Sequence, residues 1–186
     1  MIDAEQLTRR WLRDCVLGLE LCPFAAPVLR DGSLRVAVSQ SGDVQSRLRD
    51  FLLELDGLQS SPEQEISTTL LVFECGPWRF AEFLELLEDC QDLLERSGME
   101  GILQLAHFHP DYLFAGEAPE SLSHYTNRSP YPTLHLIREA MISRVLENFP
   151  SPEDIPRRNI ARLESLGESG IAGLWGPLLA EAHTAA

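Results

Sequence analysis

The sequence contains no lysine: all 15 of its basic residues are arginine, against 29 acidic residues, and the formal net charge is −14. Without lysine the protein cannot form a Schiff base with a carbonyl substrate or with pyridoxal. It also cannot build the common phosphate-binding loop, which ends in Gly-Lys followed by Ser or Thr. Nucleic acids and anionic membranes are bound largely through basic side chains, so neither is an expected partner.

Long apolar runs are missing as well. Charged residues interrupt every apolar stretch before the roughly 18 to 20 residues that a membrane span needs. Asp3, Glu5 and Asp14 interrupt the N-terminal segment in the same way. We therefore expect neither a signal peptide nor a membrane anchor.

Paired cysteine motifs are also absent. No two of the four cysteines form a Cys-x-x-Cys pair, which argues against a zinc ribbon or a thioredoxin-type motif. Cys15 and Cys90 fall on the apolar sides of predicted helices, where cysteine behaves as a small hydrophobic residue. This cysteine usage predicts a protein of the reducing cytoplasm. The pattern indicates no particular cofactor.

The order of the predicted elements is that of an α/β domain. Apolar residues at helical spacing and short β-branched runs alternate along the first two thirds of the chain. The predicted helices are 3–21, 44–55 and 76–96, and the predicted strands are 34–38, 66–73 and 101–109. This order predicts a small three- to four-stranded parallel or mixed sheet covered by helices. A ferredoxin-like arrangement, with one more strand in the next loop, stays open.

The last third of the chain begins with a loop over 110–131, which has no periodicity and is long enough to suggest a function. Leu134, Ile137, Met141 and Val145 then predict a helix over 132–148. After several prolines, a helical tail is expected, with segments at 157–166 and 174–182. The predicted division is an α/β domain over 1–149 and a helical C-terminal extension over 150–186 that packs on it.

The end of the third predicted strand carries the first candidate site residues. Strand alternation places His107 and His109 on one face, and ligands of α/β sheets bind beyond the carboxyl ends of strands. We expect His109 to be a general acid or base oriented by Asp111, with Tyr112 contacting the substrate. The alternative is a structural pair of His109 and Asp111 that fastens the long loop.

A second candidate region runs from Asn127 to His135. Ser129 and the neighbouring prolines predict a helix N-terminus, where free N–H groups and the helix dipole attract anions. Arg128 would add a two-pronged donor for a carboxylate or phosphate. Asn127, Ser129 and His135 are expected to line the same substrate pocket. The alternative for Arg128 is a loop anchor that donates to carbonyl groups.

The remaining residues considered for the site lie outside these two regions. Cys22 stands where the first predicted helix meets Pro23, and a neighbouring cation would make it a nucleophile or a second proton donor. The alternative is a buried, inert thiol. His124 and His183 are expected to be solvated surface residues.

Three blocks of the sequence together resemble one protein family. They are CPFA at 22–25, HPDYLFAG at 109–116 and NRSPYPTLHL at 127–136. In these blocks the chain is similar to a bacterial family catalogued as domain of unknown function number fourteen-fifteen, over nearly the whole chain to residue 148. The resemblance implies that the three blocks belong to one pocket, and it implies no particular reaction.

These observations lead to one main hypothesis and two alternatives. The main hypothesis is an enzyme that acts on a small anionic molecule. The first alternative is a metal-dependent hydrolase, because His107, His109 and Asp111 resemble the His-x-His-x-Asp run of metallo-β-lactamase-like proteins, although Tyr112 departs from it. The second is a non-catalytic binding or assembly module that uses the loop and residues 175–179 as a partner surface.

Overall fold

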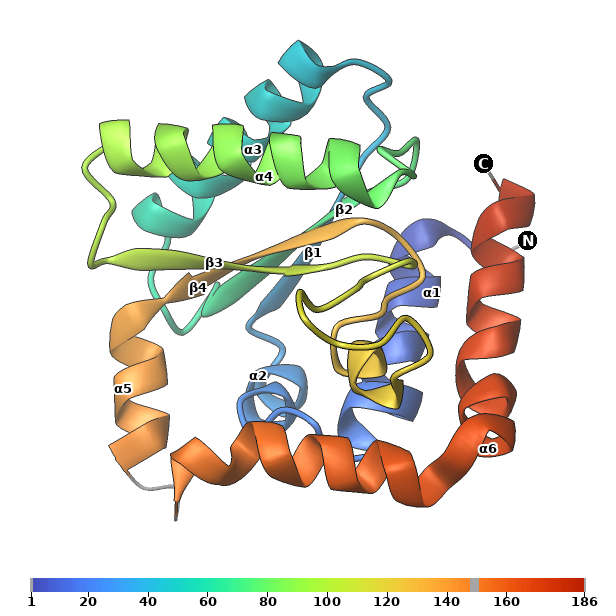
Figure 1. The fold of residues 1–186 in the computed structure, drawn as a ribbon. Coiled ribbons are helices and arrows are strands. Elements are labelled where there is room, and N and C mark those ends of the chain that lie inside the picture. The colour runs from blue at the N-terminus through green and yellow to red at the C-terminus, as the bar shows by residue number, and fades with distance from the viewer. Residues whose placement is uncertain (1, 148–150, 186) are drawn as a thin grey trace.

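The computed structural model describes residues 2–147 and 151–185. It contains a mixed four-stranded sheet with helices on both faces (Figure 1), which confirms the predicted fold class. The strands are β1 (Leu34–Ser39), β2 (Thr68–Phe73), β3 (Leu103–Phe108) and β4 (Thr133–Arg138). Their order is β1-β2-β4-β3, with β1 parallel to β2 and β4 antiparallel to both of its neighbours.

The strand β4 corrects the predicted helix over 132–148. Only α5 (Glu139–Glu147) is helical there, and the predicted end at Asn148 lies outside the described residues. The apolar residues at helical spacing belong to a strand and to the helix that follows it. Leu134 and Leu136 of β4 are fully buried, and a strand buried on both faces reads as an apolar run without clear alternation. The sequence left open the possibility of one more strand in the long loop. β4 is an additional strand, but it follows the loop instead of lying within it.

Two helices cover one face of the sheet, as predicted. They are α3 (Val44–Ser60) and α4 (Phe80–Arg96), drawn above the sheet in Figure 1. The carboxylate of Asp43 caps α3 by accepting a hydrogen bond from the Ser46 N–H at 2.9 Å, which satisfies a free donor of the first turn. The buried core between these helices and the sheet consists of Phe51, Leu55, Leu58, Leu71, Phe73, Phe83, Leu86, Cys90, Leu94, Met99, Leu103, Leu134 and Leu136.

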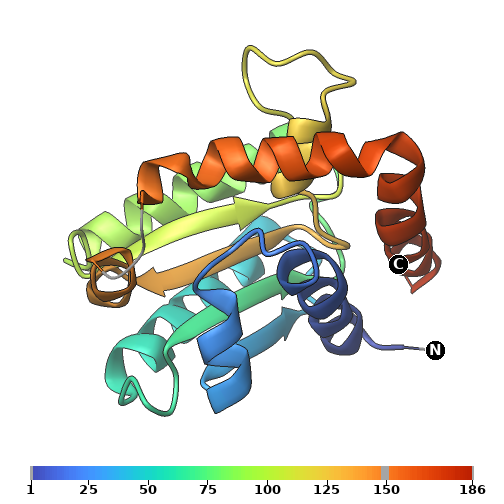
Figure 2. The same ribbon diagram turned by 90° about the horizontal axis from the view of Figure 1, so that it is seen from below.

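The other face is covered by a different set of helices, which Figure 2 shows in front of the sheet. They are α1 (Ala4–Trp11), the π-helical turn η1 (Leu12–Leu17), α2 (Ala25–Asp31), α5 and α6 (Ile155–Ala185). The predicted helix over 3–21 therefore changes to π-helical geometry after Trp11. Gly18 follows this turn, and a Cβ at that position would lie 2.3 Å from the Asp14 carbonyl oxygen. The tight turn therefore requires glycine.

The helix α6 has two arms that meet at Gly167, whose φ of 69° is easily adopted only by glycine. The arms account for the two helical segments predicted in the tail. Trp175 and Leu178 on the second arm are each 1% exposed, and the Trp175 indole N–H donates to the Arg128 carbonyl oxygen at 3.0 Å. The interpretation of this segment as a partner surface is therefore wrong for both residues, which belong to the core.

The predicted boundary between residues 149 and 150 lies outside the described residues. Buried residues of α6 share one core cluster with the sheet and with α1. None of the helices in residues 2–147 and 151–185 is long and apolar enough to cross a membrane.

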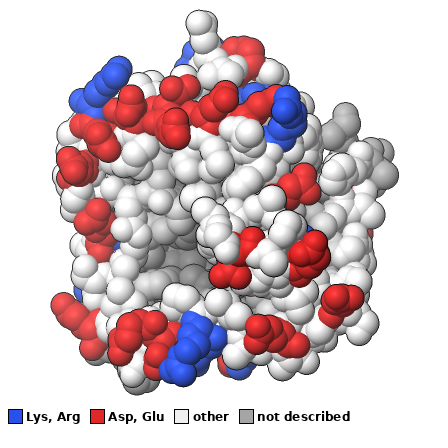
Figure 3. Space-filling view, viewed as in Figure 1, with Lys and Arg blue, Asp and Glu red and all other residues white. Residues whose placement is uncertain are grey.

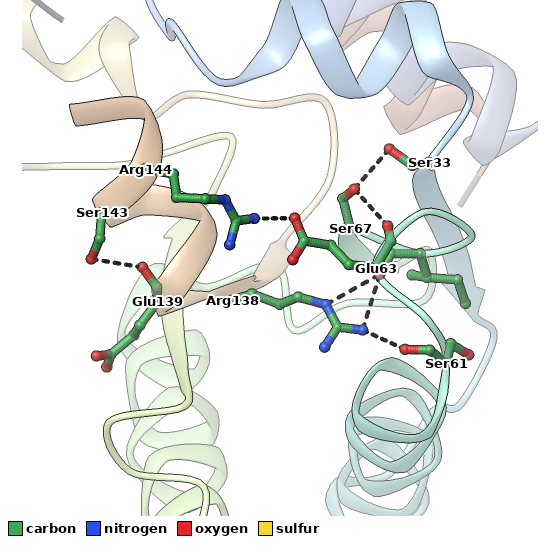
Figure 4. A network of polar contacts seen from close by, with 9 residues as sticks. Ser33, Ser61, Glu63, Ser67, Arg138, Glu139, Ser143 and Arg144 are labelled. Atoms are coloured by element: carbon green, nitrogen blue, oxygen red, sulfur yellow. Dashed lines mark hydrogen bonds and ion pairs between the residues drawn. The ribbon is translucent and has the colours of Figure 1, made fainter. Parts of the chain in front are cut away.

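Arg138, at the end of β4, fastens this strand to the connection between α3 and β2 (Figure 4). Its guanidinium donates to the carbonyl oxygens of Leu58 at 2.5 Å, Ser61 at 2.8 Å and Ile66 at 3.1 Å. Nearby, Arg144 of α5 forms an ion pair with Glu63. One side chain thus satisfies three backbone acceptors that would otherwise need other partners.

Replacing Arg138 by methionine leaves these carbonyl groups unsatisfied, so we expect the free energy of unfolding to fall by about 2 to 3 kcal/mol. Arg144→Met is the matched control on the neighbouring helix. Its ion pair is half exposed, so its loss is expected to cost less than about 1 kcal/mol. Urea unfolding of both variants tests the difference, and equal losses would contradict the anchoring role of Arg138.

Candidate functional site

A cavity with a volume of about 730 Å³ lies between the sheet and the helices α1, α2, α5 and α6. Figure 3 shows a hollow whose edges are largely uncharged, on a face where acidic groups outnumber basic ones. Most of the described side chains that line the cavity are apolar, including Trp11, Leu12, Val16, Leu21, Phe24, Ala25, Val28, Leu34, Leu70, Ala106, Phe108, Phe114, Ile137, Met141, Ile142, Leu146, Ile155, Pro156 and Ile160.

Strand register builds the floor of this cavity. His135 of β4 lies opposite Leu70 of β2 on one side and Ala106 of β3 on the other. Opposite residues of antiparallel strands point to the same face, so one imidazole stands in an otherwise apolar row. The small side chain of Ala106 leaves space above the edge strand.

A few polar side chains interrupt the apolar lining. They are Cys22, Thr68, Gln104, Glu117, Ser123, Thr126, Asn127, His135 and Asn159. Glu117 is the one charged residue among the described lining residues, and no arginine lines the cavity. A buried anion without a cationic partner is costly, so this lining disfavours anionic ligands.

The protonation of His135 follows from its hydrogen bonds. Its Nε2 lies 2.8 Å from the Thr68 hydroxyl oxygen, and that hydroxyl donates its only proton to the Leu136 carbonyl oxygen at 2.7 Å. The imidazole Nε2–H must therefore donate to Thr68, which leaves Nδ1 as an acceptor. Burial lowers the pKa of His135 to about 4, so the ring is neutral at neutral pH.

Cys22 also lines the cavity, immediately before α2. Burial raises the pKa of the Cys22 thiol, although backbone N–H groups of Phe24 and Ala25 donate to the sulfur and act in the opposite direction. No arginine lines the cavity to favour a thiolate. The group at this position is a neutral thiol in contact with the cavity.

Asn127 is a wall residue whose amide is already engaged. Its Nδ2 donates to the His107 carbonyl oxygen at 3.2 Å, and its backbone carbonyl accepts from the His109 N–H at 3.1 Å. Its side-chain oxygen accepts from the Thr126 hydroxyl at 3.1 Å. These bonds hold the end of β3 against the segment that leads into β4.

His109 lies on the opposite side of the sheet, against α4. It is fully buried and its ring packs against the rings of Phe80 and Phe83, with centroid distances of 5.2 and 5.3 Å. Its Nε2–H donates to the Pro77 carbonyl oxygen at 3.2 Å, and its Nδ1 accepts from the backbone N–H of Asp111 at 3.0 Å. Burial lowers the pKa of His109. Both ring nitrogens are thus occupied by the backbone, which matches the alternative of a loop-fastening residue.

Tyr112 belongs to the same side. It is 7% exposed, and its hydroxyl lies 3.2 Å from the His107 Nε2. Burial raises the pKa of Tyr112. Asp111 is exposed, and the bond it makes to His109 comes from its backbone.

The sequence predicted a helix N-terminus at Arg128 and Ser129. This prediction is wrong, because the segment leads into the strand β4, which begins at Thr133. The Ser129 hydroxyl donates to the Tyr131 carbonyl oxygen at 2.6 Å instead of capping a helix. The Arg128 guanidinium lies 4.4 Å from the centre of the Tyr125 ring, and its Nε donates to the Tyr112 carbonyl oxygen at 3.4 Å. The arginine fastens the loop and does not line the cavity.

The structure thus separates the predicted site residues. Cys22, Asn127 and His135 meet at the cavity. His109 packs against α4 on the other face, and Arg128 lies in the loop beside Tyr125. Each of the three blocks still supplies residues to the cavity, including Cys22, Phe114 and His135, while other residues of the second and third blocks lie away from it.

Two further expectations concern histidines. His183 is exposed as expected, whereas His124 is fully buried. The His124 Nδ1 accepts from the Phe114 N–H at 3.1 Å, and its Nε2–H donates to the Ala118 carbonyl oxygen at 2.9 Å. It fastens the long loop from inside, so its assignment to the surface is wrong.

No group of three or more His, Cys, Asp or Glu side chains suited to a metal ion is present in the described ranges. His107 and His109 instead bond to Tyr112 and Pro77. This arrangement does not support the metal-hydrolase alternative.

Comparison with known proteins identifies the family. A family model described as "Protein of unknown function (DUF1415)" matches residues 3–172, and the chain belongs to this family. The match confirms the resemblance seen in the sequence and extends past residue 148 into α6. Searches of the curated proteins and of the solved structures each found no match.

The sequence-based site missed most of the cavity floor. Gln104, Ala106 and Phe108 alternate with Leu105 and His107 of the same strand and point to the opposite face. A small alanine and a glutamine in the middle of an apolar strand were the available signal. Only the position of β4 reveals that His135 stands beside them.

The neutral state of His135 predicts a pH dependence of stability. A histidine in the unfolded chain has a pKa of about 6.5, so between about pH 6.5 and 4 the unfolded state binds a proton that the folded state does not. Stability from this group is therefore lost as the pH falls through that interval, by roughly 2 to 3 kcal/mol at its lower end.

We expect His135→Leu to remove this loss of stability at acidic pH. Urea unfolding of both proteins from about pH 7 to about pH 4.5 measures it, since the contributions of other histidines are common to both. Parallel stability profiles would show that His135 titrates normally and is not desolvated.

Proposed function

We propose that this protein binds an uncharged, largely apolar small molecule in the cavity between the sheet and the helices α1, α2, α5 and α6. The observation that carries the proposal is a cavity of about 730 Å³ whose described lining is apolar and contains no arginine. Pockets for small molecules typically have volumes of about 300 to 1,000 Å³, with apolar walls and a few polar groups. Protein interiors are otherwise closely packed, so an apolar space of this size calls for an occupant.

The charge distribution supports an uncharged ligand over the anion expected from the sequence. Arg128 is held by Tyr125 and the Tyr112 carbonyl group, away from the cavity lining. The excess of acidic groups on the face that contains the hollow (Figure 3) would also repel an approaching anion. Binding of an anion through Arg128 is a separate hypothesis.

Cys22 enters this proposal as a contact for the ligand. The sequence suggested a nucleophile or a proton donor, and its raised pKa supports a thiol that packs against the ligand without attacking it. Four free cysteines support the expectation of a reducing cytoplasm.

Blocking the cavity tests the proposal. Ala106→Phe places a ring over the floor, so we expect it to abolish binding of N-phenylnaphthylamine, an uncharged fluorescent probe of apolar cavities, with folding retained. Arg128→Ala is the comparison variant, and it should bind the probe within about twofold of the wild-type affinity because it removes no lining residue. Fluorescence titration gives both values. Unchanged binding by Ala106→Phe, or loss of binding in Arg128→Ala alone, would contradict the proposal.

The thiol of Cys22 offers an independent readout. Cys75 is exposed, whereas Cys15 and Cys90 are buried, so in a Cys75→Ser variant Cys22 is the cysteine best placed to react with N-ethylmaleimide. Its raised pKa predicts slow labelling at neutral pH, faster as the pH rises. Saturating N-phenylnaphthylamine is expected to slow labelling at least about tenfold at full occupancy, as followed by mass spectrometry. Labelling at the same rate with and without the probe would place the probe elsewhere.

A further inference from the structure

The polar atom that distinguishes the cavity floor is the His135 Nδ1. In the described part of the chain it makes no hydrogen bond, since the only side-chain bond of His135 is the one from Nε2 to Thr68. Among the described residues, three side-chain atoms are fully buried and have no hydrogen-bond partner, on Trp11, Thr69 and Tyr131, and the His135 Nδ1 is not one of them. The His135 Nδ1 has no partner in the described ranges and is not fully buried, so it is accessible from outside the protein interior. Because His135 lines the cavity, we place this atom at the cavity surface.

Three of the other polar lining side chains, Thr68, Asn127 and Asn159, are engaged within the protein, and Gln104 lies exposed near the start of β3. The Thr68 hydroxyl both accepts from His135 and donates to Leu136. The amide nitrogens of Asn127 and Asn159 donate to the carbonyl oxygens of His107 at 3.2 Å and Leu21 at 2.7 Å. The strands thus present an acceptor in the middle of an apolar surface, and an acceptor left unpaired against an apolar ligand costs free energy.

We propose that the ligand is an apolar alcohol whose hydroxyl group donates a hydrogen bond to the His135 Nδ1. This inference rests on the proposed function of the cavity and specifies the ligand class for it. An amine would enter as a cation and a carboxylic acid as an anion at neutral pH, and each would lose its hydration in an apolar space. A neutral hydroxyl satisfies the acceptor without burying a charge.

Thr68 is a positioning residue in this scheme. Its hydroxyl is committed to the Leu136 carbonyl group, which forces the proton of the imidazole onto Nε2. In Thr68→Val the constraint disappears, so the ring can place its proton on Nδ1 and become a donor toward the cavity. The threonine thus determines, through the histidine, which ligands the cavity accepts.

A pair of isomers tests the inference directly. Decanol and methyl nonyl ether contain the same atoms, but only decanol has a hydroxyl proton. In isothermal titration of the wild-type protein we expect decanol to bind about tenfold more tightly than the ether, the value of one hydrogen bond. In His135→Leu the preference is expected to vanish or reverse, with the ether still bound.

The outcomes separate the two proposals. If neither isomer binds, the proposed function of the cavity fails. If both bind equally to the wild-type protein, or if His135→Leu keeps the preference for decanol, the cavity binds apolar molecules and the assignment to His135 is overturned.

A spectroscopic measurement makes the test independent of the folding of any variant. In ¹⁵N spectra of wild-type imidazole groups, the His135 Nδ1 should show the unprotonated signal, and decanol but not the ether should shift it. In Thr68→Val we expect the imidazole proton of His135 to shift toward Nδ1. The ratio of the decanol affinity to the ether affinity should then fall. A protonated Nδ1 in the free wild-type protein would contradict the proposal outright.

Discussion

The antiparallel pairing of β4 between β2 and β3 is the constraint on which the rest of this structure depends. Its register places His135 between Leu70 and Ala106 on one face, while Leu134 and Leu136 complete the core under α3 and α4 on the other. Arg138 fixes the end of the strand to three backbone carbonyl groups (Figure 4). A shift of one residue would exchange the two faces, so the cavity floor and the core are determined together.

The two faces of the sheet differ in how closely their side chains pack. Under α3 and α4 the side chains pack closely, and the histidines at the end of β3 use their ring nitrogens to satisfy the backbone and Tyr112. On the other face the helices enclose a space that the lining does not fill. Both ring nitrogens of His109 on the first face are paired within the protein, whereas the His135 Nδ1 on the second face has no partner among the described residues.

Much of the fold was predictable because its signals are local. Residues 44–60 and 80–96 have the apolar spacing of helices packed on one side, and Thr68–Phe73 is a β-branched, apolar run with the length of a strand. Residues 133–138 lack such a signal, because a central strand buried on both faces has no polar side, and its apolar residues continue into α5 at helical spacing. Long-range pairing overrides the local pattern there.

The candidate site was harder to predict for a related reason. The titratable residues His109 and Asp111 are close in sequence and therefore favour a site at the end of β3, but backbone groups occupy both ring nitrogens of His109 there. The cavity is assembled from a few residues each of several elements that are far apart in the sequence: α1, η1, α2, the four strands, the long loop, α5 and α6. Cys22 and His135 were recognised as unusual, but the apolar residues around them become a site only when the helices are placed in space.

Amide chemical-shift mapping tests the central claim most directly. During titration of ¹⁵N-labelled protein with an uncharged apolar ligand such as decanol, the account predicts perturbations at Cys22, Leu70, Ala106 and His135, together with the first arm of α6. The amide chemical shifts of Phe51, Phe83 and Cys90, between the sheet and α3 or α4, should not change. Perturbations confined to α3 and α4, or to the loop around Arg128, would contradict the assignment of the cavity as the binding site.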